Sequence, residues 1–248
     1  MLDKDSPAPI TWQPKPKQYQ LANDALDLWC AWIPQSSTAI RAYQSYLSPT
    51  EQQRAARFCF VSDQQRYQYS RGVLRCLLAT YLGIAPSDVP LGCTVYGKPY
   101  LDIPSPPLHF NVSHSQDCVL YAVTRQHPVG IDVEYKRSID AFSLAKRFFS
   151  SDEYQQLCQT PKPLQQQFFY DLWALKEAFI KAIGLGLSFS LAQFTIELTL
   201  QQATLKQVSD PRYDIHAWQL HYFQPQHHYR AAVAMNSFIR DIHYWQWL

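Results

Sequence analysis

Several signals that would assign a protein to a particular class are missing from this sequence. No stretch approaches the roughly 18 apolar residues that a membrane-spanning helix needs, and residues 1–7 lack the apolar core of a signal peptide. Lys and Arg form no dense run, and the formal net charge is only +2, which gives no electrostatic reason to expect a nucleic-acid partner. We therefore expect a cytoplasmic protein that binds neither membrane nor nucleic acid.

The cysteines and histidines also lack the spacing of a metal site. The six cysteines are scattered without a C-x-x-C pair, and most lie in apolar stretches, where a free cysteine behaves as a small hydrophobic residue. No cysteine or acid at a usual spacing completes a zinc set with His109 and His114, or with His227 and His228. The pattern is typical of a reducing compartment.

The composition is that of a folded protein with a large core. The chain has 248 residues, of which 47% are apolar and 17% are charged, enough for one large domain or two domains of about 120 residues. Pro7, Pro9, Pro14 and Pro16 stand among polar residues, so residues 1–20 are expected to form a loose extended arm.

Periodicity predicts an α+β fold. Helices are predicted at 49–57 (with Ser48 as cap), 64–82 (closed by Gly83), 144–149, 152–158 and 164–183. Strands are predicted at 26–33, 109–112, 119–123, 129–135, 193–200, 216–223 and 230–235, with a strand and turn at 95–100. Residues 1–45 and the C-terminal residues 245–248 contain no motif that indicates a function.

A weak internal repeat relates the two halves. Residues 74–83 align with 175–184, and residues 56–58 resemble 146–148. The similarity could arise by chance between two helices, or it could mark a duplicated α/β unit with a ligand cleft between the copies. In the second interpretation Cys76 occupies the place of Glu177.

The segment 173–181 places an aromatic residue, an acid and a base on one helical face. Trp173, Glu177 and Lys181 follow one another at steps of four. Glu177 and Lys181 alone could be an ordinary surface ion pair. Trp173 on the same face argues against a purely solvated face, because a large aromatic side chain usually packs over another group.

The segment 129–135 predicts a strand with two carboxylates on one face. Asp132 and Glu134 alternate with Ile131 and Val133, so one face is apolar and the other acidic. The acids could simply face solvent. If the helix with Glu177 packs beside this strand, three carboxylates and a lysine converge, and such oxygen donors suit Mg²⁺.

The polar segment 111–115 (Asn-Val-Ser-His-Ser) has three interpretations. It could form a turn held by Asn and Ser side chains, an anion cradle, or a Ser/His nucleophile pair. The third is disfavoured because the sequence has no Gly-x-Ser-x-Gly elbow. Gly184 and Gly186 follow a helix, so we interpret Gly184 as a helix C-cap and not as part of a phosphate loop.

Five segments in order resemble those of a known family. They are GKPY (97–100), FNVSHS (110–115), VGIDVE (129–134), RFFSSDEY (147–154) and WALKEAFIK (173–181). Together they resemble a 4′-phosphopantetheinyl transferase of the larger, surfactin-synthetase-activating (Sfp) type, over roughly residues 47–194.

The resemblance implies a fold and a set of site residues. It implies two similar α/β subdomains related by a pseudo-two-fold axis, here divided into 1–127 and 128–248, which act as a monomer with coenzyme A in the cleft between them. It implies Mg²⁺ in the second subdomain, held by Asp132, Glu134 and Glu177. The residues implied for the phosphates of coenzyme A are Lys181 and nearby Lys176 at the pyrophosphate, Ser113, His114 and Lys98 at the 3′-phosphate, and Arg71 as a further contact.

The implied reaction is the transfer of 4′-phosphopantetheine to a serine of an apo acyl, peptidyl or aryl carrier protein of fatty-acid, polyketide or nonribosomal peptide synthesis. Glu177 is our first choice of general base and Glu134 the second. One alternative is a non-catalytic module that binds coenzyme A or a carrier protein, which would have no use for three convergent acids. Another is a Mg²⁺-dependent phosphoesterase or nucleotide hydrolase, for which the sequence lacks a Gly-x-x-x-x-Gly-Lys-Ser/Thr loop.

Overall fold

The computed structural model describes residues 9–16, 19–199 and 202–248. The first half of the chain forms β1 (Gln13–Pro14), β2 (Ala25–Trp32), α1 (Ser37–Arg41), α2 (Pro49–Ala56), α3 (Val61–Leu82), β3 (Leu91–Cys93), β4 (Pro99–Leu101), β5 (His109–Ser115) and β6 (Cys118–Thr124). The second half forms β7 (Val129–Tyr135), α4 (Ala141–Phe148), α5 (Ser151–Gln159), α6 (Lys162–Ile183), β8 (Phe194–Leu198), β9 (Ala203–Val208), β10 (Gln219–Phe223), β11 (Tyr229–Met235) and β12 (Asp241–Gln246). The predicted α+β class is confirmed.

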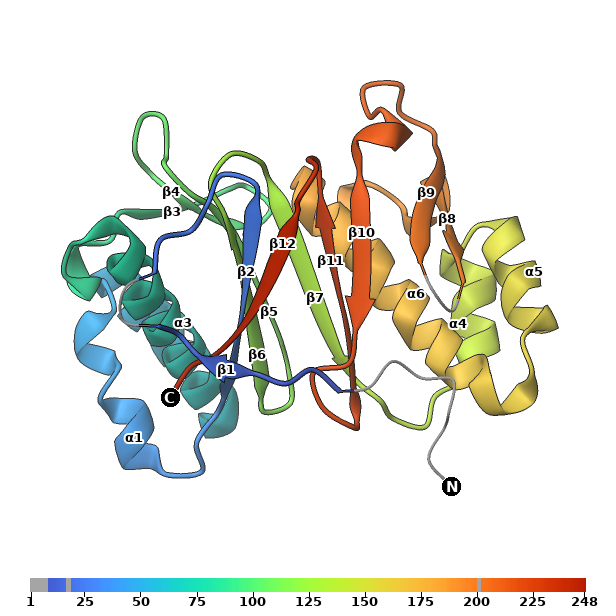
Figure 1. The fold of residues 1–248 in the computed structure, drawn as a ribbon. Helices are drawn as coiled ribbons and strands as arrows, with labels where there is room; N and C mark the ends of the chain where they lie inside the picture. Colours follow the sequence, from blue (N-terminus) through green and yellow to red (C-terminus); the bar gives the residue numbers. More distant parts are fainter. Residues whose placement is uncertain (1–8, 17–18, 200–201) are drawn as a thin grey trace.

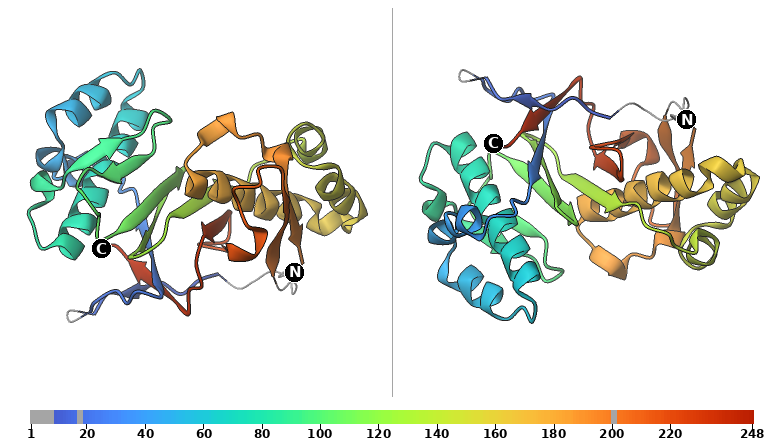
Figure 2. Two further views of the ribbon diagram at one scale, coloured as in Figure 1. Left: turned by 90° about the horizontal axis from the view of Figure 1, so that it is seen from above. Right: turned by 90° about the horizontal axis from the view of Figure 1, so that it is seen from below.

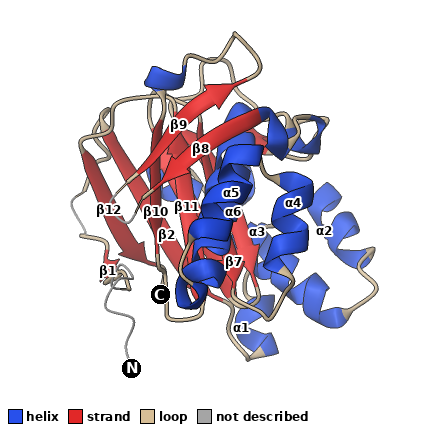
Figure 3. Cartoon of the chain, turned by 90° about the vertical axis from the view of Figure 1, so that its right-hand side faces the viewer, coloured by secondary structure: helices blue, strands red, loops and turns tan. Residues whose placement is uncertain are grey.

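Two five-stranded sheets lie between the two long helices (Figure 1). The first sheet has the order β1-β12-β2-β6-β5 and the second β7-β11-β10-β9-β8. Apolar side chains of β2, β6, β7 and β11 fill the space between the sheets, while α3 covers the outer face of the first sheet and α6 that of the second. The views from above and below show the two helices on opposite sides of the strands (Figure 2), and Figure 3 shows α6 with α4 and α5 in front of the second sheet.

The two halves repeat one topology. In each, a first strand leads through two short helices to a 22-residue helix and then to a hairpin, giving the matching orders β2-β6-β5 and β7-β11-β10. Both long helices end at a glycine in the left-handed conformation, Gly83 and Gly184. Both preceding helices begin with a capping box, Ser48 with Glu51 and Ser150 with Glu153. These shared features support the duplicated unit over a chance similarity of two helices.

The C-terminal strand departs from the expected division at residue 127. β12 pairs in parallel with β2, so a segment expected in the second subdomain completes the first sheet.

The expected loose arm also requires correction where the structure describes it. The Ile10 N–H donates to the Gln224 carbonyl, the Trp12 indole donates to the Pro225 carbonyl, and β1 pairs with β12. Residues 1–8 and 17–18 lie outside the described ranges.

The sheets meet along β5 and β7 through side chains of β5. Backbone N–H groups of β7 donate at 2.8–3.3 Å to side-chain oxygens of β5, in the pairs Ile131 to Asn111, Val133 to Ser113 and Tyr135 to Ser115. The segment 111–115 is therefore a strand, and its interpretation as a turn is wrong. These bonds satisfy the edge of β7, which would otherwise carry unpaired buried donors.

Gly130 allows α6 to lie directly on β7. A Cβ atom at this position would stand 2.0 Å from the Ala178 carbonyl oxygen and 2.3 Å from the Ala182 nitrogen, both backbone atoms of α6. Only glycine therefore permits the close approach that brings α6 to Asp132.

None of the helices in the described part of the chain has the length and apolar character needed to cross a bilayer.

We predict that Gly130→Ala forces α6 away from β7 and lowers the free energy of unfolding by about 3 kcal/mol, the upper part of the usual range for overpacking. Gly83→Ala is the matched control, because its Cβ would meet nothing within 4 Å and only the positive φ of +69° is unfavourable. This control should cost about 1 kcal/mol. Urea unfolding of both variants measures the difference, and equal losses would contradict the proposed close contact.

Candidate active site

A cavity of about 430 Å³ lies between the two halves of the molecule. Its walls come from α2 and α3, from the turn between β3 and β4, from β5, and from α6. The lining includes Arg54, Tyr67, Ser70, Arg71, Tyr96, Lys98, Asn111, Ser113, His114, Glu177, Ile180 and Lys181. The structure thus brings residues from three of the five family-like segments (97–100, 110–115 and 173–181) and from α3 to one cleft.

At the junction of β7 and α6 the cleft contains a tight polar cluster. The Lys181 ammonium lies 2.6 Å from Asp132 Oδ1 and 2.9 Å from Ser113 Oγ. The Ser113 hydroxyl donates to the same Asp132 oxygen at 2.9 Å. β7 turns Ile131 and Val133 to the core between the sheets and Asp132 toward α6, as the alternation predicted.

The carboxylates of this cluster repel one another. Burial and the charge of Asp132 raise the pKa of Glu134 to about 7, against the opposing charge of Lys181. Burial and Asp132 also raise the pKa of Glu177. Asp132 itself is 4% exposed, and its Oδ2 atom is buried without a hydrogen-bond partner among the described residues. Such a group of oxygen donors suits a further cation.

The arrangement is not a finished metal site. Within residues 9–16, 19–199 and 202–248, no group of three or more His, Cys, Asp and Glu side chains is placed so as to hold a metal ion. Lys181 instead supplies the positive charge beside Asp132. Asp132 nevertheless presents an oxygen that no group in the described ranges occupies, so the donor chemistry of the cluster fits a divalent cation.

Basic side chains line the same cleft. Arg54 and Arg71 come from α2 and α3, and His114 from β5. Burial, and then the charge of Lys181, lower the pKa of His114. Lys98 donates to the Lys181 carbonyl at 2.5 Å and lies 3.3 Å from that of Ala182, so it caps the end of α6, and burial lowers its pKa to about 8. The cleft thus joins a set of acids to a set of bases across the two halves.

Comparisons with known proteins identify the family. The 4′-phosphopantetheinyl transferase superfamily matches residues 128–234, and the N-terminal region of 4′-phosphopantetheinyl transferases matches residues 30–126. The 4′-phosphopantetheinyl transferase HetI of Nostoc sp. is 36% identical over 240 residues, which cover 96% of this chain and 98% of the relative. The chain belongs to the 4′-phosphopantetheinyl transferase superfamily.

Other members of this superfamily match shorter parts of the chain. The 4′-phosphopantetheinyl transferase Sfp of Bacillus subtilis is 36% identical over 166 residues, or 66% of this chain and 72% of the relative. The human L-aminoadipate-semialdehyde dehydrogenase-phosphopantetheinyl transferase is 33% identical over 189 residues, or 71% of this chain and 60% of the relative. The resemblance to the Sfp type is thereby confirmed.

Lys176 does not reach the cleft in this superfamily member. Its ammonium is fully buried and donates to both oxygens of Glu153 at 2.6 and 2.7 Å and to the Phe194 carbonyl at 2.7 Å. Neighbouring positions on a helix point about 100° apart, so Lys176 faces α5 and β8 while Glu177 faces the cleft. The expectation that Lys176 adds charge at the pyrophosphate is therefore wrong.

Sequence reasoning missed three residues of the site. Arg54 and Tyr67 line the cleft but belong to no segment that indicated a function. Glu51, the buried partner of Arg71, was hidden because an acid in the first turn of a helix ordinarily serves as a cap. Its pairing with Arg71 and Arg75, which lie one turn apart on α3, becomes evident only when α2 and α3 are known to pack together.

We predict that Lys176→Met lowers the free energy of unfolding by about 3–5 kcal/mol, because Glu153 is left buried without its cation. The double variant Lys176→Met/Glu153→Gln should recover most of this loss in urea unfolding, since glutamine can keep the capping box. Unchanged stability of Lys176→Met, together with weaker coenzyme A binding, would contradict the structural role and show that Lys176 contacts coenzyme A.

Proposed function

We propose that this protein transfers 4′-phosphopantetheine from coenzyme A to a serine hydroxyl of an apo carrier protein and releases adenosine 3′,5′-bisphosphate. The observation that carries the proposal is the cluster of Asp132, Glu177 and Lys181 where β7 meets α6, open to a cleft that also contains arginines of the other half. Family membership supports the reaction class. The nucleophile belongs to the partner protein, so the chain needs none of its own.

Asp132, Glu134 and Glu177 are the residues proposed to hold Mg²⁺. The buried, unpartnered Oδ2 atom of Asp132 and the raised pKa values of the two glutamates support this assignment, because a divalent cation would relieve the repulsion among them. When bound, the ion would supply Lewis-acid polarisation of the pyrophosphate.

Lys181 is proposed to stabilise the charge that develops on the oxygen of the departing nucleotide. The bond between the β-phosphorus and this bridging oxygen breaks as the serine oxygen bonds to phosphorus. Ser113 and Asp132 hold the Lys181 ammonium in place before the substrate binds, so little reorganisation is needed during the reaction.

Glu177 is proposed as the general base that takes the proton of the serine hydroxyl, directly or through water, with Glu134 as second candidate. Glu177 lines the cleft, so its carboxylate is open to a serine hydroxyl that the carrier protein brings there. His114 and Arg71 on the opposite wall are proposed to bind the remaining phosphate of coenzyme A, with Ser113 between the two walls and Lys98 as a further contact from the end of α6.

The second substrate is proposed to be an acyl, peptidyl or aryl carrier protein, which the enzyme would modify as a cytoplasmic monomer. Carrier proteins of fatty-acid, polyketide and nonribosomal peptide synthesis all offer the same serine chemistry. The carrier class is therefore tested by comparing them in one assay.

We predict that an apo carrier protein incubated with this protein, coenzyme A and Mg²⁺ gains the mass of one phosphopantetheinyl group. Intact-mass spectrometry measures the gain, and EDTA should abolish it. Release of adenosine 3′,5′-bisphosphate without any carrier would instead indicate a hydrolase. Binding of coenzyme A without modification of fatty-acid, polyketide or peptide carriers would indicate a binding module.

We predict that Asp132→Ala loses at least about 10²-fold in turnover, the scale of one charge-stabilising element in an active site.

Glu177→Gln should lower kcat far more than coenzyme A affinity, because the amide keeps the shape of the side chain but cannot accept the proton. Steady-state kinetics and equilibrium binding separate the two effects. Unchanged turnover of Glu177→Gln would move the base to Glu134.

A further inference from the structure

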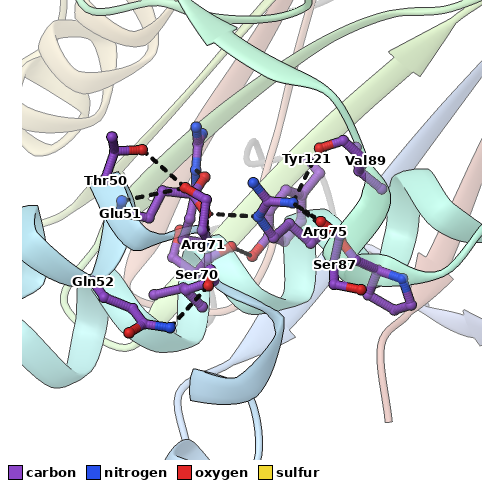
Figure 4. A network of polar contacts seen from close by, with 12 residues as sticks. Thr50, Glu51, Gln52, Ser70, Arg71, Arg75, Ser87, Val89 and Tyr121 are labelled. Carbon is purple, nitrogen blue, oxygen red and sulfur yellow. Dashed lines mark hydrogen bonds and ion pairs between the residues drawn. The ribbon is translucent and has the colours of Figure 1, made fainter.

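A buried carboxylate of α2 holds two arginines of α3 beside the cleft. Glu51, 6% exposed, accepts from Arg71 Nε at 2.5 Å and from Arg75 Nε at 2.6 Å, and it also accepts from the Ser48 N–H at 2.8 Å. Figure 4 shows Glu51, Arg71 and Arg75 in one network of polar contacts. The carboxylate is therefore fixed from three directions.

Arg75 is anchored and fixes Glu51 in turn. Its Nη1 atom donates to the carbonyls of Pro86, Ser87 and Val89 at 3.0–3.3 Å, and its side chain is 3% exposed. Burial acts to raise the pKa of Glu51, but the hydrogen bond from Arg75 and the charge of Arg71 outweigh it and lower this pKa. Glu51 thus stays ionised at neutral pH and holds a set position.

Arg71 is bound differently from Arg75. It uses only Nε for Glu51, and no acceptor in the described part of the chain is recorded for its two terminal nitrogens. Its side chain lines the cleft, and the Tyr121 hydroxyl holds the Ser70 carbonyl just before it at 2.9 Å. A guanidinium held through Nε presents its remaining N–H donors as a fork that suits phosphate oxygens.

The second half of the molecule provides an internal comparison. There Glu153, at the same position of its capping box as Glu51, pairs with Lys176, which aligns with Arg75. The position that aligns with Arg71 is Leu172, which is fully buried. One buried ion pair is thus enough to hold α6 against α5. Arg71, the second cation on Glu51, has no counterpart in the second half, where Leu172 stands in its place.

We propose that Glu51 is a positioning residue that orients Arg71 toward the 3′-phosphate of coenzyme A. The inference rests on the proposed function, in which Lys181 and the carboxylates on α6 and β7 take the pyrophosphate. The phosphate that remains then falls to the wall formed by α3 and β5. Glu51 touches no substrate atom and acts only through Arg71.

The experiment compares coenzyme A with 3′-dephospho-coenzyme A as donor substrates. Arg71→Met should lower the ratio of their kcat/KM values about 10- to 100-fold, the scale of losing a charged hydrogen bond. Glu51→Gln should lower the same ratio through a higher KM for coenzyme A, with kcat at saturation unchanged. The double variant Glu51→Gln/Arg71→Met should lose no more than Arg71→Met alone.

Glu153→Gln is the matched control, since it weakens the corresponding buried pair of the other half. It should lower the unfolding midpoint and leave the ratio of the two donors unchanged. A Glu51→Gln variant that folds and keeps the wild-type ratio would overturn the inference and leave Glu51 as a structural residue only.

A second variant keeps the test decisive if Glu51→Gln fails to fold. Arg71→Lys retains the charge without the fork, so it should lose most of the preference for coenzyme A. Full preference in Arg71→Lys would show that an oriented guanidinium is not needed and would overturn the inference. Absence of transfer by the wild type with either donor would overturn the proposed function itself, and this inference with it.

Discussion

The site depends on the hydrogen bonds that side chains of β5 accept from the backbone of β7. A buried sheet edge has to find partners for its N–H groups, and here Asn111, Ser113 and Ser115 supply them. The same bonds fix how β7 lies against the first half of the molecule, so Ser113 also reaches Asp132. With Gly130 admitting α6 to contact distance, Lys181 completes the cluster. The geometry that joins the two halves is thus also the geometry that assembles the polar cluster.

The two copies of the duplicated unit share a buried ion pair that holds the long helix, but they differ in the residues beside that pair. Each half holds its long helix with one buried ion pair between the first turn of a preceding helix and the middle of the long one. Next to these pairs the copies differ in a complementary way. The first half has Arg71 and the apolar Cys76, and the second has Leu172 and the acidic Glu177. The first copy therefore contributes only a cation to the cleft from this pair of positions, whereas the second contributes the acid Glu177 together with Lys181.

Local patterns predicted much of this structure. Ser48 followed by Pro49 began α2, Gly83 and Gly184 ended the long helices, and the alternation around Asp132 gave a strand with one acidic face. β9 and β12 were missed, and β12 is specified by partners more than 200 residues away. The burial of Lys176 was also beyond sequence reasoning, because hydropathy treats a lysine as exposed until the acid that neutralises it is placed beside it.

The position of β12 in the first sheet sets the order in which the molecule can be completed. Until residues 241–246 have left the ribosome, β2 has β6 on one side and an open edge on the other. An open edge of an apolar strand is a template for pairing with other chains, and contacts between distant segments form slowly. A chain that stops before residue 241 would thus carry this exposed edge permanently. The half of the protein that is synthesised first is the half that is finished last.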